Sequence, residues 1–308
     1  LSHTRPAMYA TLMGNTINVA LNYFLIFGFW IFPKMGVEGA ALGTLISRIA
    51  MLLFMGLYVR YNKRFISFAQ NIVFKKPNWN LFKKIIRLGF PSALQMFFEV
   101  VFFTAAIWLS GFLGKNSQAA NQIALNLSSM TFMFAMGLGV TAMIRVGNQK
   151  GKNDYEALKR IAYSIFLLMF VFDVLFCLFF LLTNNYLPWI YLDGSNPLQI
   201  SDVTQVVKLA STLLIVSAFF QISDGIQAVV LGALRGLQDV NIPAFIIFFA
   251  YGIFGLPISF YLGLHTSLGV TGIWIGLLSG LTASAILLLI RFNYMTQKLI
   301  LNNPNGTT

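Results

Sequence analysis

Long apolar segments alternate with short polar ones along the whole chain. Most apolar segments are about 20 residues or longer, the length that an α-helix needs to cross a hydrocarbon core of ~30 Å. They predict eight membrane-spanning helices, at residues 9–32, 38–59, 88–113, 118–144, 160–183, 206–232, 242–264 and 270–291. The predicted fold class is therefore all-α and integral to a membrane.

The charge of the chain supports this class and indicates how the helices are oriented. Of 308 residues, 57% are hydrophobic and 10% charged, and the net charge is +12. Basic residues gathered on one soluble face would indicate nucleic acid, but here they alternate between loops, and only Lys34, Lys115 and Lys208 fall on the sparsely charged side. Because Lys and Arg mark cytoplasmic loops, we expect a multi-pass protein of the cell (inner) membrane with both chain ends in the cytoplasm. We expect the lipid bilayer and no nucleic acid as a partner.

The first and last predicted helix pairs share a motif. Residues 36–43 read GVEGAALG and residues 269–276 read GVTGIWIG, so GVxGxxxG recurs at an offset of 233 residues. An even number of spans separates the copies, which therefore have the same orientation, as in parallel repeats. The alternative is chance, because glycines at this spacing are common where membrane helices pack.

This repeat predicts a twelve-helix transporter of two six-helix lobes, of which the chain holds eight helices. Residues 1–60 would be the last two helices of the N-terminal lobe. Residues 61–87 would be a cytoplasmic linker with an interfacial stretch around Trp79–Lys84, and residues 88–308 a complete six-helix C-terminal lobe with a cytoplasmic tail. About four helices of the N-terminal lobe would precede the chain.

Two carboxylates, Glu99 and Asp224, lie deep inside predicted spans. An ionised side chain near the bilayer centre costs roughly 2.5–3.5 kcal/mol on insertion scales, so each acid is a candidate functional residue. Each has polar neighbours at helical spacing, which must face protein or water rather than lipid. A third acid, Asp173, has only apolar neighbours at that spacing and ranks below the other two.

Amide side chains extend these polar stripes and are candidates for a substrate cavity or a polar network. The alternative for any one amide is that it joins two helices by a hydrogen bond. The single Cys177 and the two histidines give no disulfide and no metal-ligand spacing. The amide candidates are Gln95, Gln122, Asn126, Gln221 and Gln227, together with Asn18 and Asn22 in the first span.

Several motifs together resemble the MATE (multidrug and toxin extrusion) family, in particular its NorM-like branch. They are Gly89-Phe90-Pro91 leading to Met96-Phe97-Phe98-Glu99-Val100, Asn121-Gln122-Ile123-Ala124-Leu125-Asn126 followed by Ile144-Arg145-Val146-Gly147, and Ser223-Asp224 followed by Gly232-Ala233-Leu234-Arg235-Gly236. The resemblance covers essentially the whole chain.

The resemblance implies an antiporter that exports cationic or amphipathic organic compounds in exchange for Na+ or H+. It assigns cation or proton coupling, and with it Na+ binding, to Glu99 and Asp224, and places Asn18 and Asn22 in the polar network of the other lobe. Phe220 is a further candidate for the substrate cavity. It departs from the family, whose members can carry a tyrosine there, and lacks that hydroxyl as a Na+ ligand. We expect no cofactor beyond the coupling ion, and a monomer.

Two other functions are compatible with a bundle of this kind. A flippase for lipids or lipid-linked saccharides would favour a basic cavity, whereas the predicted spans contain, away from their ends, three acids and one basic residue, Arg48. A membrane enzyme could use Glu99 and Asp224 as a general acid and base, but no nucleophile or metal constellation accompanies them. The sequence therefore favours transport of cations over both alternatives.

Overall fold

The computed structural model describes residues 5–28, 33–62, 78–192 and 200–302, and all regular structure in these ranges is helical. Within them, eight helical segments are long and apolar enough to cross a membrane. They coincide with the eight predicted spans, which confirms the all-α membrane fold. Contacts divide the chain into unit 1, Leu1–Asn78, and unit 2, Trp79–Thr308.

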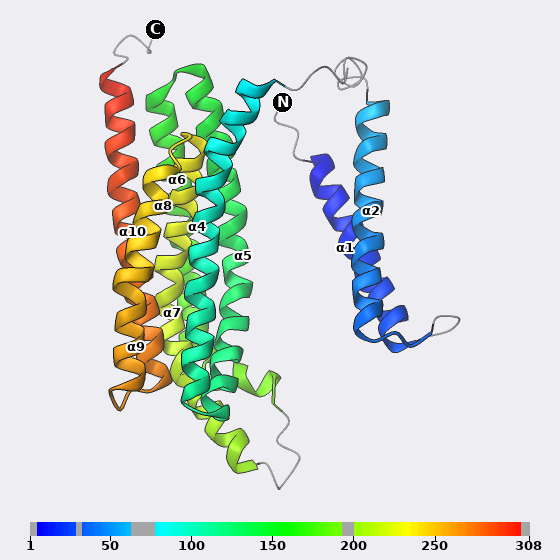
Figure 1. Ribbon diagram of the computed structural model, residues 1–308, viewed down its shortest axis with the longest axis vertical. Helices are drawn as coiled ribbons and strands as arrows, with labels where there is room; N and C mark the ends of the chain where they lie inside the picture. The colour runs from blue at the N-terminus through cyan, green and yellow to red at the C-terminus, as the bar shows by residue number, and fades with distance from the viewer. Residues whose placement is uncertain (1–4, 29–32, 63–77, 193–199, 303–308) are drawn as a thin grey trace. The chain divides into compact units, whose positions relative to one another are not determined.

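Unit 1 is a pair of packed helices, α1 (Arg5–Phe27) and α2 (Val37–Tyr61) (Figure 1). The two helices meet through small residues, as is usual where helices pack within lipid. Gly39 of α2, for example, lies so close to Leu25 that a Cβ atom would be 2.6 Å from its carbonyl oxygen. Most other side chains of the pair are exposed within this unit.

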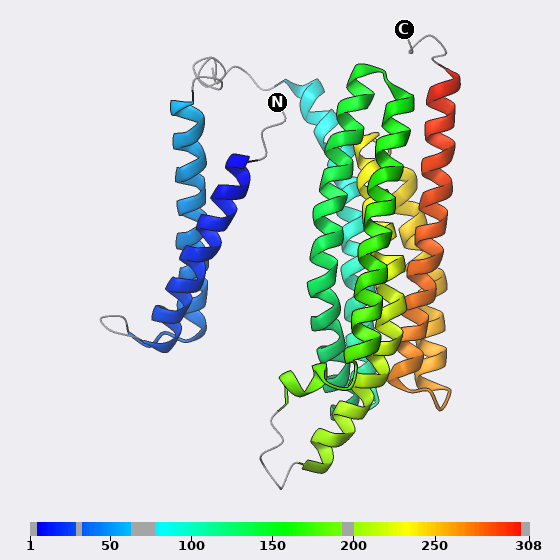
Figure 2. The ribbon, with the colours of Figure 1, turned by 180° about the vertical axis from the view of Figure 1, so that it is seen from behind.

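Unit 2 is a bundle in which α7 is the central helix (Figures 1 and 2). It packs mainly against α5, α6 and α10. The elements in chain order are α4 (Trp79–Phe112), α5 (Lys115–Lys152), α6 (Tyr155–Thr183), the short 3-10 helix η1 (Leu187–Ile190), α7 (Ile200–Gly236), α8 (Asn241–Phe248), the π-helical segment η2 (Phe249–Gly255), α9 (Leu256–Leu264) and α10 (Val270–Leu301).

Helix α4 begins well before the predicted span 88–113. Residues 79–87, assigned from the sequence to the linker, form its first turns, while residues 63–77 of that linker lie outside the described residues. These turns carry both apolar and basic side chains, a composition that suits a membrane interface better than the hydrocarbon core. An apolar run therefore marks the membrane-crossing part of a helix and not its first residue.

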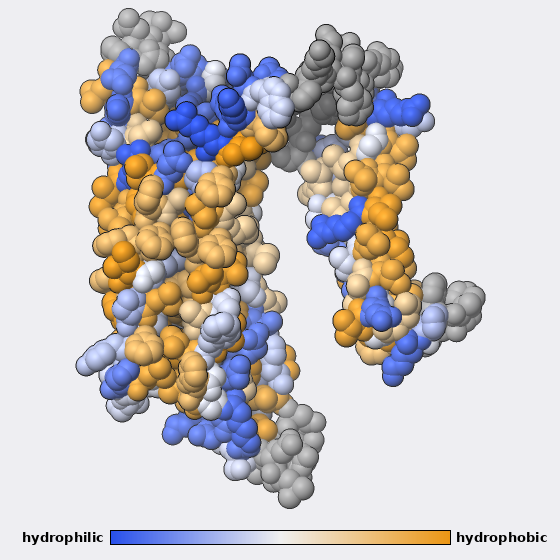
Figure 3. Space-filling view, viewed as in Figure 1, coloured by the Kyte–Doolittle hydropathy of each residue, from blue (hydrophilic) through white to orange (hydrophobic). Residues whose placement is uncertain are grey.

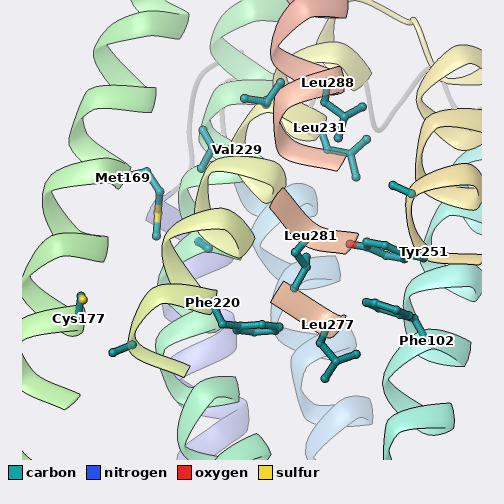
Figure 4. Close-up of a cluster of buried hydrophobic side chains, with 14 of the residues drawn as sticks. Phe102, Met169, Cys177, Phe220, Val229, Leu231, Tyr251, Leu277, Leu281 and Leu288 are labelled. Carbon is teal, nitrogen blue, oxygen red and sulfur yellow. The ribbon is translucent and has the colours of Figure 1, made fainter. Parts of the chain in front are cut away.

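The interior of unit 2 is a continuous apolar core between α4, α7 and α10. Figure 4 shows Phe220, Leu277 and Leu281 alongside Tyr251 and Phe102, whose rings stack at 4.4 Å between centroids. The outer face carries a broad apolar band, visible in Figure 3, as a lipid-facing surface requires. Hydrophobic side chains thus point both inward and outward, and the few polar ones inside must be explained individually.

The predicted span 242–264 is interrupted by π-helical geometry. The wide turns of η2 come just before Pro257, which has no N–H to donate to the preceding turn and whose ring crowds the carbonyl of Ile253. Such π-bulges occur frequently at functional sites. Here the bulge contains Tyr251, whose side chain is fully buried in the bundle.

Candidate functional site

A cavity of about 510 Å³ lies inside unit 2, between α4, α5 and α7. Glu99 reaches it from α4 and Asp224 from α7, so two acids that are 125 residues apart in the sequence face one space. Most of the remaining wall is apolar. Its side chains include Met96, Phe103, Phe132, Met136, Met143 and Phe220.

The two acids differ in how far they are withdrawn from solvent. Asp224 is 6% exposed, and its Oδ1 atom has no hydrogen-bond partner among the described residues. Glu99 is half-buried, and the charges of the two carboxyl groups repel each other when both are ionised. A cation or a proton held between them would offset that repulsion and supply the missing partner of Asp224.

Arg235 is a cavity residue that the sequence assigned to a loop. It lies in the last turn of α7, lines the same cavity, and is attracted electrostatically by Glu99. The sequence counted Arg48 as the one basic residue within the spans and did not include Arg235. It did so because the apolar run ends at residue 232, while the helix continues to Gly236.

Gln95 holds Arg235 in place instead of lining the cavity. Its Oε1 atom accepts hydrogen bonds from Nε and Nη2 of Arg235, at 3.1 and 3.0 Å. Its Nε2 atom donates to the carbonyl of Val240 at 2.8 Å, and the side chain is fully buried. A single glutamine therefore ties α4 to both the end of α7 and the start of α8.

The other predicted amides divide into cavity residues and one residue behind the wall. Gln122, Asn126 and Gln227 line the cavity, and the hydroxyl of Tyr191 donates to Oδ1 of Asn126 at 2.8 Å. Gln221 lies outside the lining, 4% exposed, and neither of its amide atoms has a partner among the described residues. The structure thus brings the first three to one cavity, and their role in binding substrate stays a prediction.

A tyrosine hydroxyl reaches the site from an element that the sequence did not single out. Tyr251 of η2 donates to Oε1 of Gln227 at 2.7 Å and lies within the electrostatic range of Glu99 and Asp224. Phe220, the position that lacks a hydroxyl, lines the cavity and packs against Trp274. The hydroxyl of Tyr251 therefore lies behind Gln227, outside the lining of the cavity.

Asp173 lies closer to the site than its apolar neighbours in sequence suggest. It is 2% exposed on α6, and its carboxyl group packs against Gly225 of α7, the residue after Asp224. Its Oδ2 atom has no partner within the part of the chain that the structure describes. The helical spacing around residue 173 could not reveal this, because Asp224 and Gly225 lie on another helix.

In unit 1, Asn18 and Asn22 form part of one hydrogen-bonded group. Asn22 donates to Oδ1 of Asn18 at 3.2 Å, and Asn18 donates to Thr44 and Ser47 of α2 at 3.3 and 3.4 Å. These contacts fit both the predicted polar network and the alternative that amides join helices. All four residues of this hydrogen-bonded group belong to unit 1.

The oxygen donors in the cavity suit a hard cation better than a soft transition metal. Within the described ranges, no three His, Cys, Asp or Glu side chains come together as metal ligands. Two carboxylates with amide oxygens nearby are hard oxygen donors of the kind that alkali and alkaline-earth cations prefer. The unpartnered Oδ1 of Asp224 fits such an ion as well as it fits a proton.

Comparisons with known proteins agree with this picture. Residues 91–261 match the family described as MatE. The chain is 35% identical over 302 residues to the multidrug resistance protein MdtK of Photorhabdus laumondii, covering 97% of the chain and 64% of that protein. It is 32% identical over 291 residues to the probable multidrug resistance protein NorM of Agrobacterium fabrum, covering 94% and 62%.

Solved structures share the fold. The crystal structure of the eukaryotic MATE transporter AtDTX14 superposes with a TM-score of 0.81 at 21% identity, covering 96% of this chain and 64% of that one. An outward-facing multidrug resistance MATE family transporter of the MOP superfamily gives 0.79 at 19% identity, covering 95% and 62%. The chain spans just under two thirds of the length of the relatives it matches. The family match extends over more than half of its residues, and the chain therefore belongs to the MatE family.

Proposed function

We propose that the complete protein is a cation-coupled antiporter that exports cationic or amphipathic organic compounds by alternating access. The observation that carries this proposal is a cavity with mostly apolar walls that both Glu99 and Asp224 line. An organic cation and an inorganic cation or proton would compete for the same carboxylates. Occupation by one would then exclude the other, and this exclusion couples the two fluxes.

The composition of the walls supports an amphipathic cargo. Aromatic and methionine side chains surround the acids, and an aromatic face attracts a cation by roughly 0.5–2 kcal/mol. Met side chains adapt to cargoes of different shape. The names of the relatives, multidrug resistance proteins, agree with this class of cargo.

A lipid or lipid-linked saccharide flippase is the alternative within the same architecture. Its phosphate-bearing cargo would need a basic cavity, but the lining has two acids and one arginine, which is itself held by Gln95. If the complete protein bound lipid pyrophosphates and no organic cations, the flippase function would be favoured over the antiporter. An enzymatic function has no support, since the family is one of transporters.

The environment proposed for the protein follows from its charges. On the basis of the loop asymmetry in Lys and Arg, we place it in the cell (inner) membrane, with both ends of this chain in the cytoplasm. We expect it to be a monomer. Residues 1–60 and 88–308 would belong to two lobes joined by a linker at 61–87. Glu99 and Asp224 would hold Na+ or H+ and require no other cofactor.

Neutralisation of each acid tests the proposal. The complete protein in proteoliposomes should export a fluorescent amphipathic cation such as rhodamine 6G when a Na+ gradient or a pH gradient is imposed separately. Glu99→Gln and Asp224→Asn should abolish this efflux, while thermal unfolding in detergent shows that both variants fold. Glu156→Gln, which neutralises an exposed acid in the first turn of α6, is the matched control and should export normally.

The gradient that drives efflux identifies the coupling ion. Normal coupled efflux by both cavity variants would reject the assignment of these carboxylates. Efflux that needs neither gradient would reject antiport altogether.

A further inference from the structure

A second pocket, of about 480 Å³, lies at the end of unit 2 where α4 begins. One wall is the first turns of α4, with three exposed basic side chains, Lys83, Lys84 and Arg87. The other wall is the connection from α7 to α8. Its residues are Gln238, Val240 and Asn241, and no acid lines the pocket among the described residues.

The α7–α8 wall is held in place from three sides. Lys150 of α5 donates to the carbonyl of Leu237 at 2.5 Å, and Gln95 of α4 donates to that of Val240. Asp239 forms an ion pair with Arg291 of α10 at 2.7 Å. The one acid in this connection is therefore already neutralised, and the wall keeps its shape without an occupant.

The field in the pocket is positive. Lys150 lies near enough to Lys84 for their charges to repel, although it does not line the pocket itself. The N-terminus of α8 also opens at Asn241 with no side-chain cap, which adds a partial positive charge. Several like charges around one concave space raise the local concentration of anions.

The position of the pocket indicates where that anion comes from. The same turns of α4 expose Trp79, Phe82 and Ile86 beside the basic residues, a mixture that places them at the boundary of a membrane. Figure 3 shows hydrophilic side chains gathered at this end of unit 2, next to the apolar band. A phosphate at this depth belongs to a lipid headgroup.

We propose that this pocket binds the phosphate group of an anionic phospholipid. Lys83, Lys84 and Arg87 would contact the phosphate oxygens, and basic pockets at the cytoplasmic ends of membrane helices bind anionic headgroups in this way. Gln95 lines neither space but connects them, because it bonds both the pocket residue Val240 and the cavity residue Arg235. A bound lipid would therefore stabilise the α7–α8 connection and, through Gln95, the position of Arg235.

Binding can be measured without transport, so this test is independent of the proposed function. The complete purified protein is incubated with phosphatidylglycerol, with phosphatidylcholine or with inorganic phosphate, and bound molecules are counted by native mass spectrometry. The wild-type protein should retain phosphatidylglycerol in preference to the other two. The triple variant Lys83→Gln, Lys84→Gln, Arg87→Gln should lose affinity by about fivefold per charge, or on the order of 100-fold in all.

The control removes three charges from the same end of unit 2, outside the pocket: Lys152→Gln, Lys159→Gln, Arg160→Gln. It should bind like the wild type. Gln238→Glu is a further variant that keeps all three cations and adds a negative charge to the wall, and it should also weaken binding. Equal retention by the triple and control variants, equal retention of the two lipids, or binding of inorganic phosphate without lipid would each overturn the proposal.

Discussion

Replacing Gly232 with Ala should weaken the contact between α5 and α7 at the cavity wall. A methyl group there would lie 2.7 Å from the carbonyl carbon and 2.9 Å from the Cα atom of Gly139. Carbon atoms in ordinary contact are about 3.5–4.0 Å apart, so the two backbones would have to separate by about 1 Å. Neither neighbour is a flexible side chain, and rotation of a side chain cannot relieve the clash.

The magnitude follows from two opposing effects. Overpacking of a well-packed interior costs about 1–3 kcal/mol, and alanine regains up to about 1 kcal/mol over glycine in a helix. We expect the free energy of unfolding to fall by about 1–2 kcal/mol. Because both glycines line the cavity, separating α5 from α7 should also lower the affinity for the exported cation.

Gly137→Ala is the matched control on α5, since no atom lies within 4 Å of the added methyl group. Thermal unfolding of the purified variants in detergent compares the two substitutions directly. Gly137→Ala should leave the apparent Tm unchanged or slightly higher, whereas Gly232→Ala should lower it. Equal Tm values would refute the close approach of the two helices.

Two further substitutions test the residues around the acids. Tyr251→Phe removes the hydroxyl partner of the buried Gln227 amide and should lower the stability by about 1–3 kcal/mol, measured by thermal unfolding, with little change in side-chain volume. Gly225→Ala would place a methyl group against the carboxyl group of Asp173 and should lower the apparent Tm. Asp173→Ala in the same protein should restore part of that loss, and no restoration would show that this contact is not the cause.

The spans and the main acids could be predicted because their signals are local. Membrane-spanning helices need about 20 apolar residues each, and these runs are continuous in the sequence. Glu99 and Asp224 stand out because an acid within such a run is costly. Gln122, Asn126 and Gln227 follow from helical spacing, which places residues three, four or seven apart on one face.

The remaining site residues could not be predicted because their role depends on contacts between helices. Arg235 follows the end of an apolar run, and only the extension of α7 to Gly236 and its packing in the bundle bring it to the cavity, where Gln95 holds it. Nothing in the sequence distinguishes Tyr251 from the other aromatic residues, and only the structure shows that its hydroxyl bonds Gln227. Asp173 has apolar neighbours on its own helix, and its proximity to Asp224 depends on Gly225 having no side chain.

The repeated motif GVxGxxxG gains its meaning from backbone geometry. Gly36 precedes α2 with φ 56° and ψ −124°, and Gly269 precedes α10 with φ 54° and ψ −131°. Such angles are open almost only to glycine. Three residues later, Gly39 and Gly272 each lie against the carbonyl group of a leucine in the preceding helix, so a Cβ atom on either would clash. Glycines spaced by chance would not reproduce both the left-handed turn and the close approach that follows it. The motif therefore encodes the same start of a helix, packed on the helix before it, at two places in the chain, and this recurrence is what the predicted pair of six-helix lobes leads us to expect.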